Sequence, residues 1–369
     1  MKNRTSYGTH ISESGTDIVV CPAFCDVHVH FREPGRPDKE TILTGCRAAA
    51  AGGYTAVCPM PNLDPAPDSL ATLGVQLDII ERDAFVDVRP YATITMGRGG
   101  TVPVDIRSLK NSVAAFSDDG SGVQDDSVML RAMEIAAAEG CIIAAHCEDR
   151  RFGTLPEGEW RQLERDLKLA EKAGCKYHVC HISTKESVDL IRRAKDRGVD
   201  VSCETAPHYV VLSEEDRTDE GRFKMNPPLR TAADRDAILE GLLDGTIDMI
   251  ATDHAPHTEE EKSRGFEGSA FGIVGLETAF PVLYTALVRG GVMSLEKLVA
   301  LMGTAPRRRF GIDPDTEDYA VFDITSPYRI DSGTFLSKGR STPFEGMEVY
   351  GRCLKTVHNG KTVYEAGNL

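Results

Sequence analysis

The imidazole and carboxylate side chains best suited to hold a metal ion stand at the ends of short apolar runs in this sequence. His28 and His30 close the first run, and the alternation of a strand would place both on one face. The others end a later run or follow it: Asp118, Asp119, His146, His181, Asp253, His254 and His257. Four imidazoles with two carboxylates suit one or two zinc-like ions, which make bound water reactive.

Each of these motifs is weak alone. Alternate histidines often occur by chance on an amphipathic strand, Asp118-Asp119-Gly120 is ordinarily a turn, and an aspartate such as Asp253 can cap a helix. The combination is specific, because five separate strands would carry a ligand-type residue at the same end. Two other histidines suit simpler roles. We expect His178 to pack outside the sheet and His208 to be a hydrogen-bonded loop residue.

Eight apolar or β-branched runs supply the strands that must position these groups: 19–30, 55–60, 86–95, 113–117, 141–146, 177–182, 199–205 and 247–252. Helix-like segments alternate with them at 39–51, 69–82, 127–139, 159–173, 185–197 and 233–243, and two more follow at 276–288 and 295–301. This alternation predicts an α/β fold, and eight strands close a (β/α)8 TIM-type barrel. An open doubly wound sheet is the alternative. In a barrel the ligand-type residues would share the carboxyl ends of the strands, where barrel enzymes build their sites.

The C-terminal part of the chain changes character. Residues 319–324 and 353–364 have the composition of strands, and Asn359-Gly360 suits a hairpin turn. We therefore expect a barrel over residues 18–308 and a small accessory β unit made from residues 1–17 and 309–369, with a short N-terminal share.

The composition is that of a soluble globular protein. The chain has 369 residues, 41% of them hydrophobic and 27% charged, which excludes a disordered or coiled-coil chain. A net charge of −15 argues against a nucleic-acid partner. No apolar run approaches the ~20 residues of a membrane span. The ten cysteines lack a CxxC motif and are expected to be buried reduced thiols of a cytoplasmic protein.

Several motifs resemble those of the dihydroorotases, within the cyclic amidohydrolase superfamily. The first spans residues 26–35, Asp-Val-His-Val-His-Phe-Arg-Glu-Pro-Gly. The others lie, in chain order, at 58–62, 116–120, 145–148, 178–185, 224–230, 251–257, 271–278 and 335–346. The resemblance covers about residues 18–365 and is specific to the bacterial branch that lacks a carboxylated lysine.

The resemblance implies a role for each matched residue. Zinc, one or two ions per subunit, would be held by His28, His30, Asp119, His146, His181 and Asp253. Asp119 would take the bridging place that a carboxylated lysine fills elsewhere, and Asp253 would also be the catalytic base. Substrate contacts would come from Arg32, Asn62, Asn226, His257, Phe271 and Gly272.

The implied activity is the reversible cyclisation of N-carbamoyl-L-aspartate to L-dihydroorotate, a step of de novo pyrimidine biosynthesis. The implied partners are a second copy of the chain in a homodimer and aspartate carbamoyltransferase. Two alternatives stay open: another cyclic amidohydrolase, of hydantoinase or allantoinase type, and a non-catalytic dihydroorotase-like partner of aspartate carbamoyltransferase. Arg32, Asn62 and Asn226 favour a carboxylate-bearing substrate. Residues 149–173 form a shorter segment than usual in this family, so the cover of the pocket or the subunit contacts could differ.

Overall fold

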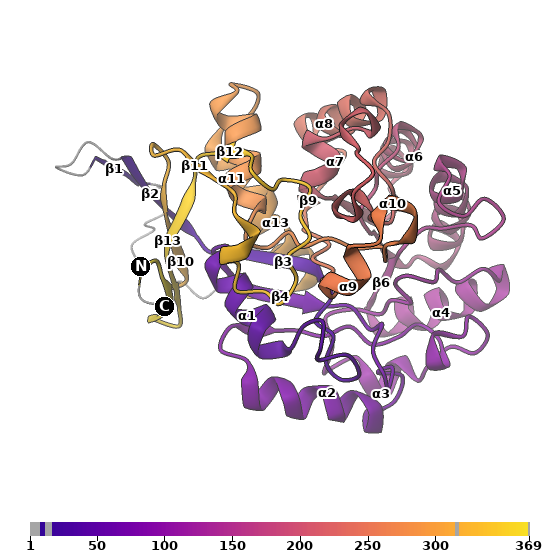
Figure 1. The fold of residues 1–369 in the computed structure, drawn as a ribbon. Coiled ribbons are helices and arrows are strands. Elements are labelled where there is room, and N and C mark those ends of the chain that lie inside the picture. The colour runs from indigo at the N-terminus through magenta and orange to yellow at the C-terminus, as the bar shows by residue number, and fades with distance from the viewer. Residues whose placement is uncertain (1–7, 12–16, 314–316, 368–369) are drawn as a thin grey trace, which may run out of the picture.

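The computed structural model describes residues 8–11, 17–313 and 317–367 of the chain (Figure 1). Of the accessory segment predicted at residues 1–17, all but strand β1 (Gly8–Ile11) and Asp17 lies outside the described residues. No helix in the described ranges is long and apolar enough to cross a membrane.

The centre of the molecule is a ring of parallel strands. They are β3 (Phe24–Val29), β4 (Tyr54–Pro59), β5 (Asp87–Val88), β6 (Ile142–Ala145), β7 (Lys176–Val179), β8 (Val201–Thr205) and β9 (Met249–Ile250). The ladders run β3-β4-β5 and β6-β7-β8-β9. Phe116 joins them, because it bridges to Ala92 on one side and to Ile143 on the other. A parallel bridge between Val29 and His254 closes the ring, so the predicted (β/α)8 barrel is confirmed.

Helices cover the outside of this ring (Figure 1). Those that alternate with the strands are α1 (Ile42–Ala51), α2 (Leu70–Asp83), α3 (Ile106–Leu109), α4 (Asp126–Glu139), α5 (Pro156–Ala173), α6 (Lys185–Asp196), α7 (Pro207–Val211) and α8 (Ala232–Asp244). Local sequence fixes their ends. The Thr184 side chain accepts from Ser187 N at the start of α6, and α4, α5 and α8 end at glycines in the left-handed conformation.

The helices after β9 are less regular than the sequence predicts. They are α9 (Glu259–Lys262), α10 (Gly265–Gly268), α11 (Ala279–Leu283), α12 (Leu295–Val299) and α13 (Ala305–Phe310). The expected helix at 276–288 begins later and passes into π-type hydrogen bonding over Tyr284–Arg289. The expected helix at 295–301 runs further, through a π-type turn over Ala300–Thr304, into α13.

A five-stranded antiparallel sheet lies beside the barrel, in the order β1-β2-β10-β13-β14. Its remaining members are β2 (Asp17–Pro22), β10 (Tyr319–Asp323), β13 (Arg352–His358) and β14 (Lys361–Glu365), and a separate pair is formed by β11 (Tyr328–Arg329) and β12 (Glu348–Val349). Asn359 and Gly360 make the predicted hairpin turn, both with positive φ. The prediction of one strand over 19–30 is wrong, because β2 ends before Ala23 and belongs to this sheet, whereas β3 enters the barrel.

Aromatic packing holds the sheet against the barrel. The ring centroid of Phe24, on β3, lies 5.6 Å from that of Phe322 on β10 and 5.4 Å from that of Phe280 on α11. All three side chains are fully buried. The N-terminal and C-terminal parts of the chain therefore share one apolar core where the barrel begins.

Candidate metal centre

The predicted site residues meet in one pocket of about 300 Å³ at the carboxyl ends of the barrel strands. Its lining includes eleven of the twelve predicted residues: His30, Arg32, Asn62, Asp119, His146, His181, Asn226, Asp253, His257, Phe271 and Gly272. The twelfth, His28, is fully buried beneath them. Residues from distant parts of the sequence thus converge at the mouth of the barrel.

The strand ends are held in register by buried hydrogen bonds between the first and last strands of the barrel. The His30 backbone N–H donates to His254 O over 2.8 Å. The Asp26 carboxylate accepts from the backbone N–H of His28, at 3.0 Å, and from that of Thr252. These bonds place His28 and His30 beside Asp253.

The first group of ligand-type atoms surrounds His28 and His30. His28 Nε2 lies 3.5 Å from Asp119 Oδ1 and 3.5 Å from Asp253 Oδ1, while His30 Nε2 lies 3.0 Å from Asp253 Oδ1. His28 Nε2 and Asp119 Oδ1 are buried and have no hydrogen-bond partner among the described residues. Two buried polar atoms without hydrogen-bond partners lower the stability of the fold unless a third group binds both. A divalent cation fits this requirement.

A second group combines Asp119 with His146 and His181. His146 Nδ1 is 2.9 Å from His181 Nε2, and each imidazole lies 3.8 Å from Asp119 Oδ1. The ligand atoms of these three residues all lie within 4.8 Å of one another, as do those of His28, His30 and Asp119. Asp119 therefore stands between the two groups, which suits a bridging carboxylate.

The neighbouring aspartate has a different position. Asp118 Oδ1 accepts the backbone N–H groups of Ile94 and Thr95, and its other oxygen accepts the Thr95 hydroxyl. Its carboxylate thus fixes the loop after β5. Asp119 is oriented from its backbone, where its carbonyl accepts from Arg98 Nη2 at 2.6 Å.

Burial and charge act in opposite directions on these groups. Burial alone would lower the pKa of His28, but Glu204, Asp119 and Asp253 outweigh it and raise that pKa well above its usual value. Burial would likewise raise the pKa of Asp119 and Asp253, yet the surrounding imidazoles hold both well below the usual range. Both carboxylates are therefore ionised and suited to a cation.

The residues predicted to contact substrate lie above the ligand groups. Arg32 is half-buried beside the loop after β9 and donates from Nε to Pro256 O at 3.3 Å. Asn62 Oδ1 lies 3.0 Å from His30 Nδ1, and Asn226 Nδ2 donates to Glu148 Oε2 at 2.7 Å. Gly272 has a φ of 136°, and a Cβ there would come within 2.6 Å of Ala255 O, so only glycine fits this close approach.

Several acidic and basic partners of these residues were not predicted. Glu204 Oε1 accepts from His28 Nδ1, and Lys39 and Glu261 contact His257. Glu148 contacts His146 as well as Asn226. Glu204 stands in the apolar run 199–205, and a carboxylate at a strand position is a signal that could have been used, because a buried charge requires a partner.

Two predictions about histidines are wrong. His178 points into the barrel, where Nδ1 is 2.8 Å from Ser202 Oγ and Nε2 is 3.1 Å from Glu204 Oε2. The alternation that placed it outside stops at Val179, where β7 ends, and His181 has a positive φ of 29°. His208 lies in α7, not in a loop, and its buried Nε2 has no partner among the described residues. Burial lowers the pKa of His208 to about 4.

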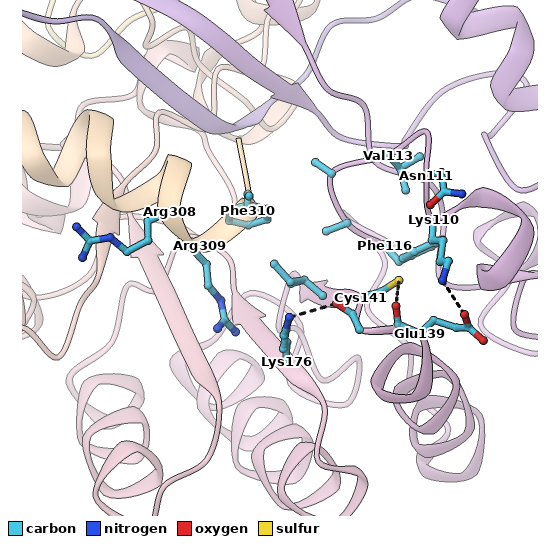
Figure 2. A pocket seen from close by; sticks show the side chains of 15 residues that line it. Lys110, Asn111, Val113, Phe116, Glu139, Cys141, Lys176, Arg308, Arg309 and Phe310 are labelled. Atoms are coloured by element: carbon cyan, nitrogen blue, oxygen red, sulfur yellow. Dashed lines mark hydrogen bonds and ion pairs between the residues drawn. The ribbon is translucent and has the colours of Figure 1, made fainter. Parts of the chain in front are cut away.

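A second pocket, of about 410 Å³, lies at the end of the barrel where the strands begin (Figure 2). Its two lysines already have protein partners: Lys110 Nζ is 2.9 Å from Glu139 Oε2, and Lys176 Nζ donates to Gly140 O at 3.3 Å. Its lining contains no histidine and only one carboxylate, Glu139. Among the described residues, the groups of side chains that could hold a metal ion therefore lie away from this pocket.

Comparison with known proteins agrees with this geometry. A family model described as dihydro-orotase-like matches residues 17–187. The dihydroorotase of Fusobacterium nucleatum subsp. nucleatum is 46% identical over 370 residues, which cover 94% of this chain and 87% of that protein. The dihydroorotase of Bacillus cereus (strain AH820) is 45% identical over 373 residues, with the same coverage.

Solved structures of related hydrolases share the fold. The L-hydantoinase (dihydropyrimidinase) from Arthrobacter aurescens has a TM-score of 0.86 and 26% sequence identity, over 96% of this chain and 87% of that one. The dihydropyrimidinase from Brevibacillus agri NCHU1002 has a TM-score of 0.81 and 22% identity, over 94% and 85%. At that level of identity the second match supports the fold alone.

Proposed function

This chain belongs to the dihydroorotase family, and from that premise we propose that its pocket catalyses the reversible cyclisation of N-carbamoyl-L-aspartate to L-dihydroorotate. The observation that carries the proposal is the convergence of six ligand-type side chains with Arg32 at one barrel mouth. A hydantoinase would need the hydrolytic centre but not a guanidinium in the pocket for a substrate carboxylate. A non-catalytic relative would not need the ligand set, which is present in full.

We propose that His28, His30, Asp119, His146, His181 and Asp253 hold one or two zinc ions. Bound zinc would lower the pKa of water and stabilise negative charge on the reacting oxygen. Glu204 Oε1 accepts from His28 Nδ1 at 2.6 Å, and Asn62 Oδ1 accepts from His30 Nδ1 at 3.0 Å. Each contact keeps the proton on Nδ1 and leaves Nε2 as the ligand atom.

In the hydrolytic direction, water adds to the ring amide carbonyl and the carbon–nitrogen bond breaks. Asp253 would accept the proton of that water and deliver it to the departing ring nitrogen. Its carboxylate is ionised and faces the same side of the pocket as Asp119 and His30. In the cyclising direction the same carboxylate would take the proton of the ureido nitrogen and return it as water is lost.

The side chains above Asp253 would orient the substrate. The planar guanidinium of Arg32 can bind a carboxylate through two parallel hydrogen bonds. None of the described residues accepts a hydrogen bond from its terminal nitrogens, which leaves that edge for the substrate. The remaining contacts to the substrate would come from Asn226, which is held by Glu148, and from the backbone at Phe271-Gly272.

Two measurements on one purified sample test this function. Metal content is determined by elemental analysis, and hydrolysis is followed with L-dihydroorotate, hydantoin and allantoin. We expect one or two zinc ions per chain and turnover of L-dihydroorotate above the other two substrates. Preference for hydantoin or allantoin would reassign the substrate, and a metal-free, inactive protein would favour the non-catalytic role.

We also propose a homodimer, contact with aspartate carbamoyltransferase and a cytoplasmic location. Leu70 and Val75 on α2 expose 59% and 43% of their surface and offer apolar area for a protein contact. All ten cysteines are free, and nine are buried, as expected for a reducing compartment. Light scattering of the chain alone, and mixed with aspartate carbamoyltransferase, tests the two assemblies.

A further inference from the structure

His257 is contacted through a single ring nitrogen by both an ammonium and a carboxylate. Lys39 Nζ lies 3.1 Å from His257 Nδ1, and Glu261 Oε2 lies 3.2 Å from the same atom. Lys39 also forms an ion pair with Glu261, with 2.8 Å between Nζ and Oε1. Lys39 is only 8% exposed, which is unusual for a lysine, so its charge is held in place by this triangle.

The chemistry of the three groups decides where the protons lie. An ammonium only donates hydrogen bonds, so His257 Nδ1 must accept from Lys39. A proton on Nδ1 would point at the ammonium and repel it. Glu261 Oε2 does not require that proton, because it lies 3.2 Å from the Thr258 backbone N–H and 3.3 Å from its hydroxyl, both of which donate to it.

We propose that Lys39 is a positioning residue that fixes His257 as the neutral tautomer with its proton on Nε2, so that this N–H donates to a carboxylate oxygen of the substrate. The inference rests on the proposed function for the identity of that oxygen, but not for the tautomer. Lys39 acts through His257 and touches no reacting atom.

The other edge of the ring is directed to the pocket. His257 lines it, and a Cβ on Gly272 would lie 3.0 Å from His257 Cδ2, the carbon next to Nε2. None of the described residues makes a hydrogen bond to Nε2, whereas Nδ1 has both contacts. Burial, assisted by the charges of Arg32 and Lys39, lowers the pKa of His257 to about 4, so the ring is neutral at neutral pH.

A neutral donor suits this place because Arg32 already supplies positive charge. An imidazole with the opposite tautomer would present a lone pair to the carboxylate and repel it. Replacement of Lys39 by Met keeps most of the aliphatic stem but removes the donor. Nδ1–H would then donate to Glu261, and Nε2 would become an acceptor.

The first test reads the tautomer without substrate. ¹⁵N NMR of histidine-labelled protein distinguishes a protonated from an unprotonated ring nitrogen, and the His257→Asn spectrum identifies the signals of His257. We expect the Nε2 proton in the natural protein and the Nδ1 proton in Lys39→Met. A proton on Nδ1 in the natural protein, or an unchanged tautomer in the variant, would overturn the inference whatever the enzyme catalyses.

The second test is kinetic. Lys39→Met should raise KM for L-dihydroorotate ~10–100-fold with kcat changed less than ~3-fold, because a ground-state contact is lost. In Lys39→Met/Glu261→Gln, the glutamine amide can donate to Nδ1, so KM should return most of the way. Additive loss in the double variant would show that Lys39 has only a structural role.

Two controls separate these outcomes from misfolding. Glu261→Gln alone retains Lys39, so His257 should keep its proton on Nε2. Loss of that proton would show that Glu261, and not Lys39, determines the tautomer of His257. Lys338→Met removes another lysine that holds the same loop, by donation to Pro37 O at 2.6 Å, and should leave KM unchanged. If Lys39→Met does not fold, Glu261→Gln still decides between the two partners.

Discussion

Glu204 Oε1 accepts a hydrogen bond from His28 Nδ1 over 2.6 Å, and both side chains are buried in the barrel beneath the pocket. The second oxygen of Glu204 lies 3.1 Å from His178 Nε2. One carboxylate therefore sets the orientation of an imidazole whose Nε2 faces Asp119. Burial opposes ionisation of Glu204, but His28 and His178 hold its pKa at about 2.

Glu204→Gln should weaken metal binding ~10–100-fold, because the neutral amide orients and polarises His28 less well. The measurement is the chelator concentration that removes half of the bound metal, with dihydroorotate turnover read on the same samples. Glu171→Gln, which breaks an exposed ion pair with Arg197, is the matched control. Equal metal affinity in Glu204→Gln and in the control would contradict this role.

Asp253→Asn should lower kcat ~10²–10⁴-fold, the range expected for loss of a proton-transfer group. Circular dichroism should show an unchanged fold, since Asp253 stands after the short strand β9 and not within it. Metal content must be measured beside turnover because Asp253 is also a proposed ligand. Near-normal turnover in a variant that retains its metal would remove Asp253 from the proton-transfer step.

Arg32→Lys should raise KM for L-dihydroorotate ~10–100-fold and alter kcat less. An ammonium cannot reproduce the two parallel hydrogen bonds of a guanidinium, and it would lose the Nε contact to Pro256 O. Initial rates over a range of substrate concentrations give both constants. An unchanged KM would mean that the carboxylate binds elsewhere in the pocket.

Glu277→Gln should make the protein more stable at pH 8 than the natural protein, and equally stable at pH 4. Burial raises the pKa of Glu277 from 4.5 to about 7, although Leu336 N–H and Ser337 N–H donate to it. A raised carboxyl pKa contributes stability that is complete below 4.5 and lost as the pH rises through about 7. Glutamine keeps the acceptor without this loss.

The readout is thermal unfolding at both pH values, with an expected gain of ~2 °C at pH 8. Glu240→Gln, on the exposed side of α8, is the control. A gain of the same size at pH 4 and pH 8 would show that ionisation of Glu277 is not its cause.

The barrel could be predicted because its strands and helices alternate with clear differences in composition. The residues at which the strands end were harder to predict. The run at 247–252 contains only a two-residue ladder, β9, and the run at 113–117 joins the ring through the single residue Phe116. Most residues of both runs are buried, so hydrophobicity does not reveal where strand pairing stops. The run at 19–30 is also apolar throughout much of its length, so its sequence does not show that the chain passes from the antiparallel sheet to the barrel at Ala23.

The convergence of the ligand-type side chains could be predicted because histidine and aspartate are unusual at the ends of buried strands. Their supporting partners could not be. Glu204 is 176 positions from His28, and Lys39 is 218 positions from His257, so only the folded barrel pairs them. The prediction for His178 was wrong for a local reason. Side chains alternate between the two faces only while the strand continues, and β7 ends at Val179.

The bridge between Val29 and His254 has a consequence for assembly of the protein. It joins the two ends of the barrel, and Asp26 accepts the Thr252 N–H across the same boundary. A growing chain that has not reached this boundary holds His28 and His30 but lacks Asp253. The complete centre can therefore form only after the last barrel segment has been synthesised. An ion bound there would link the first and last barrel segments of the chain.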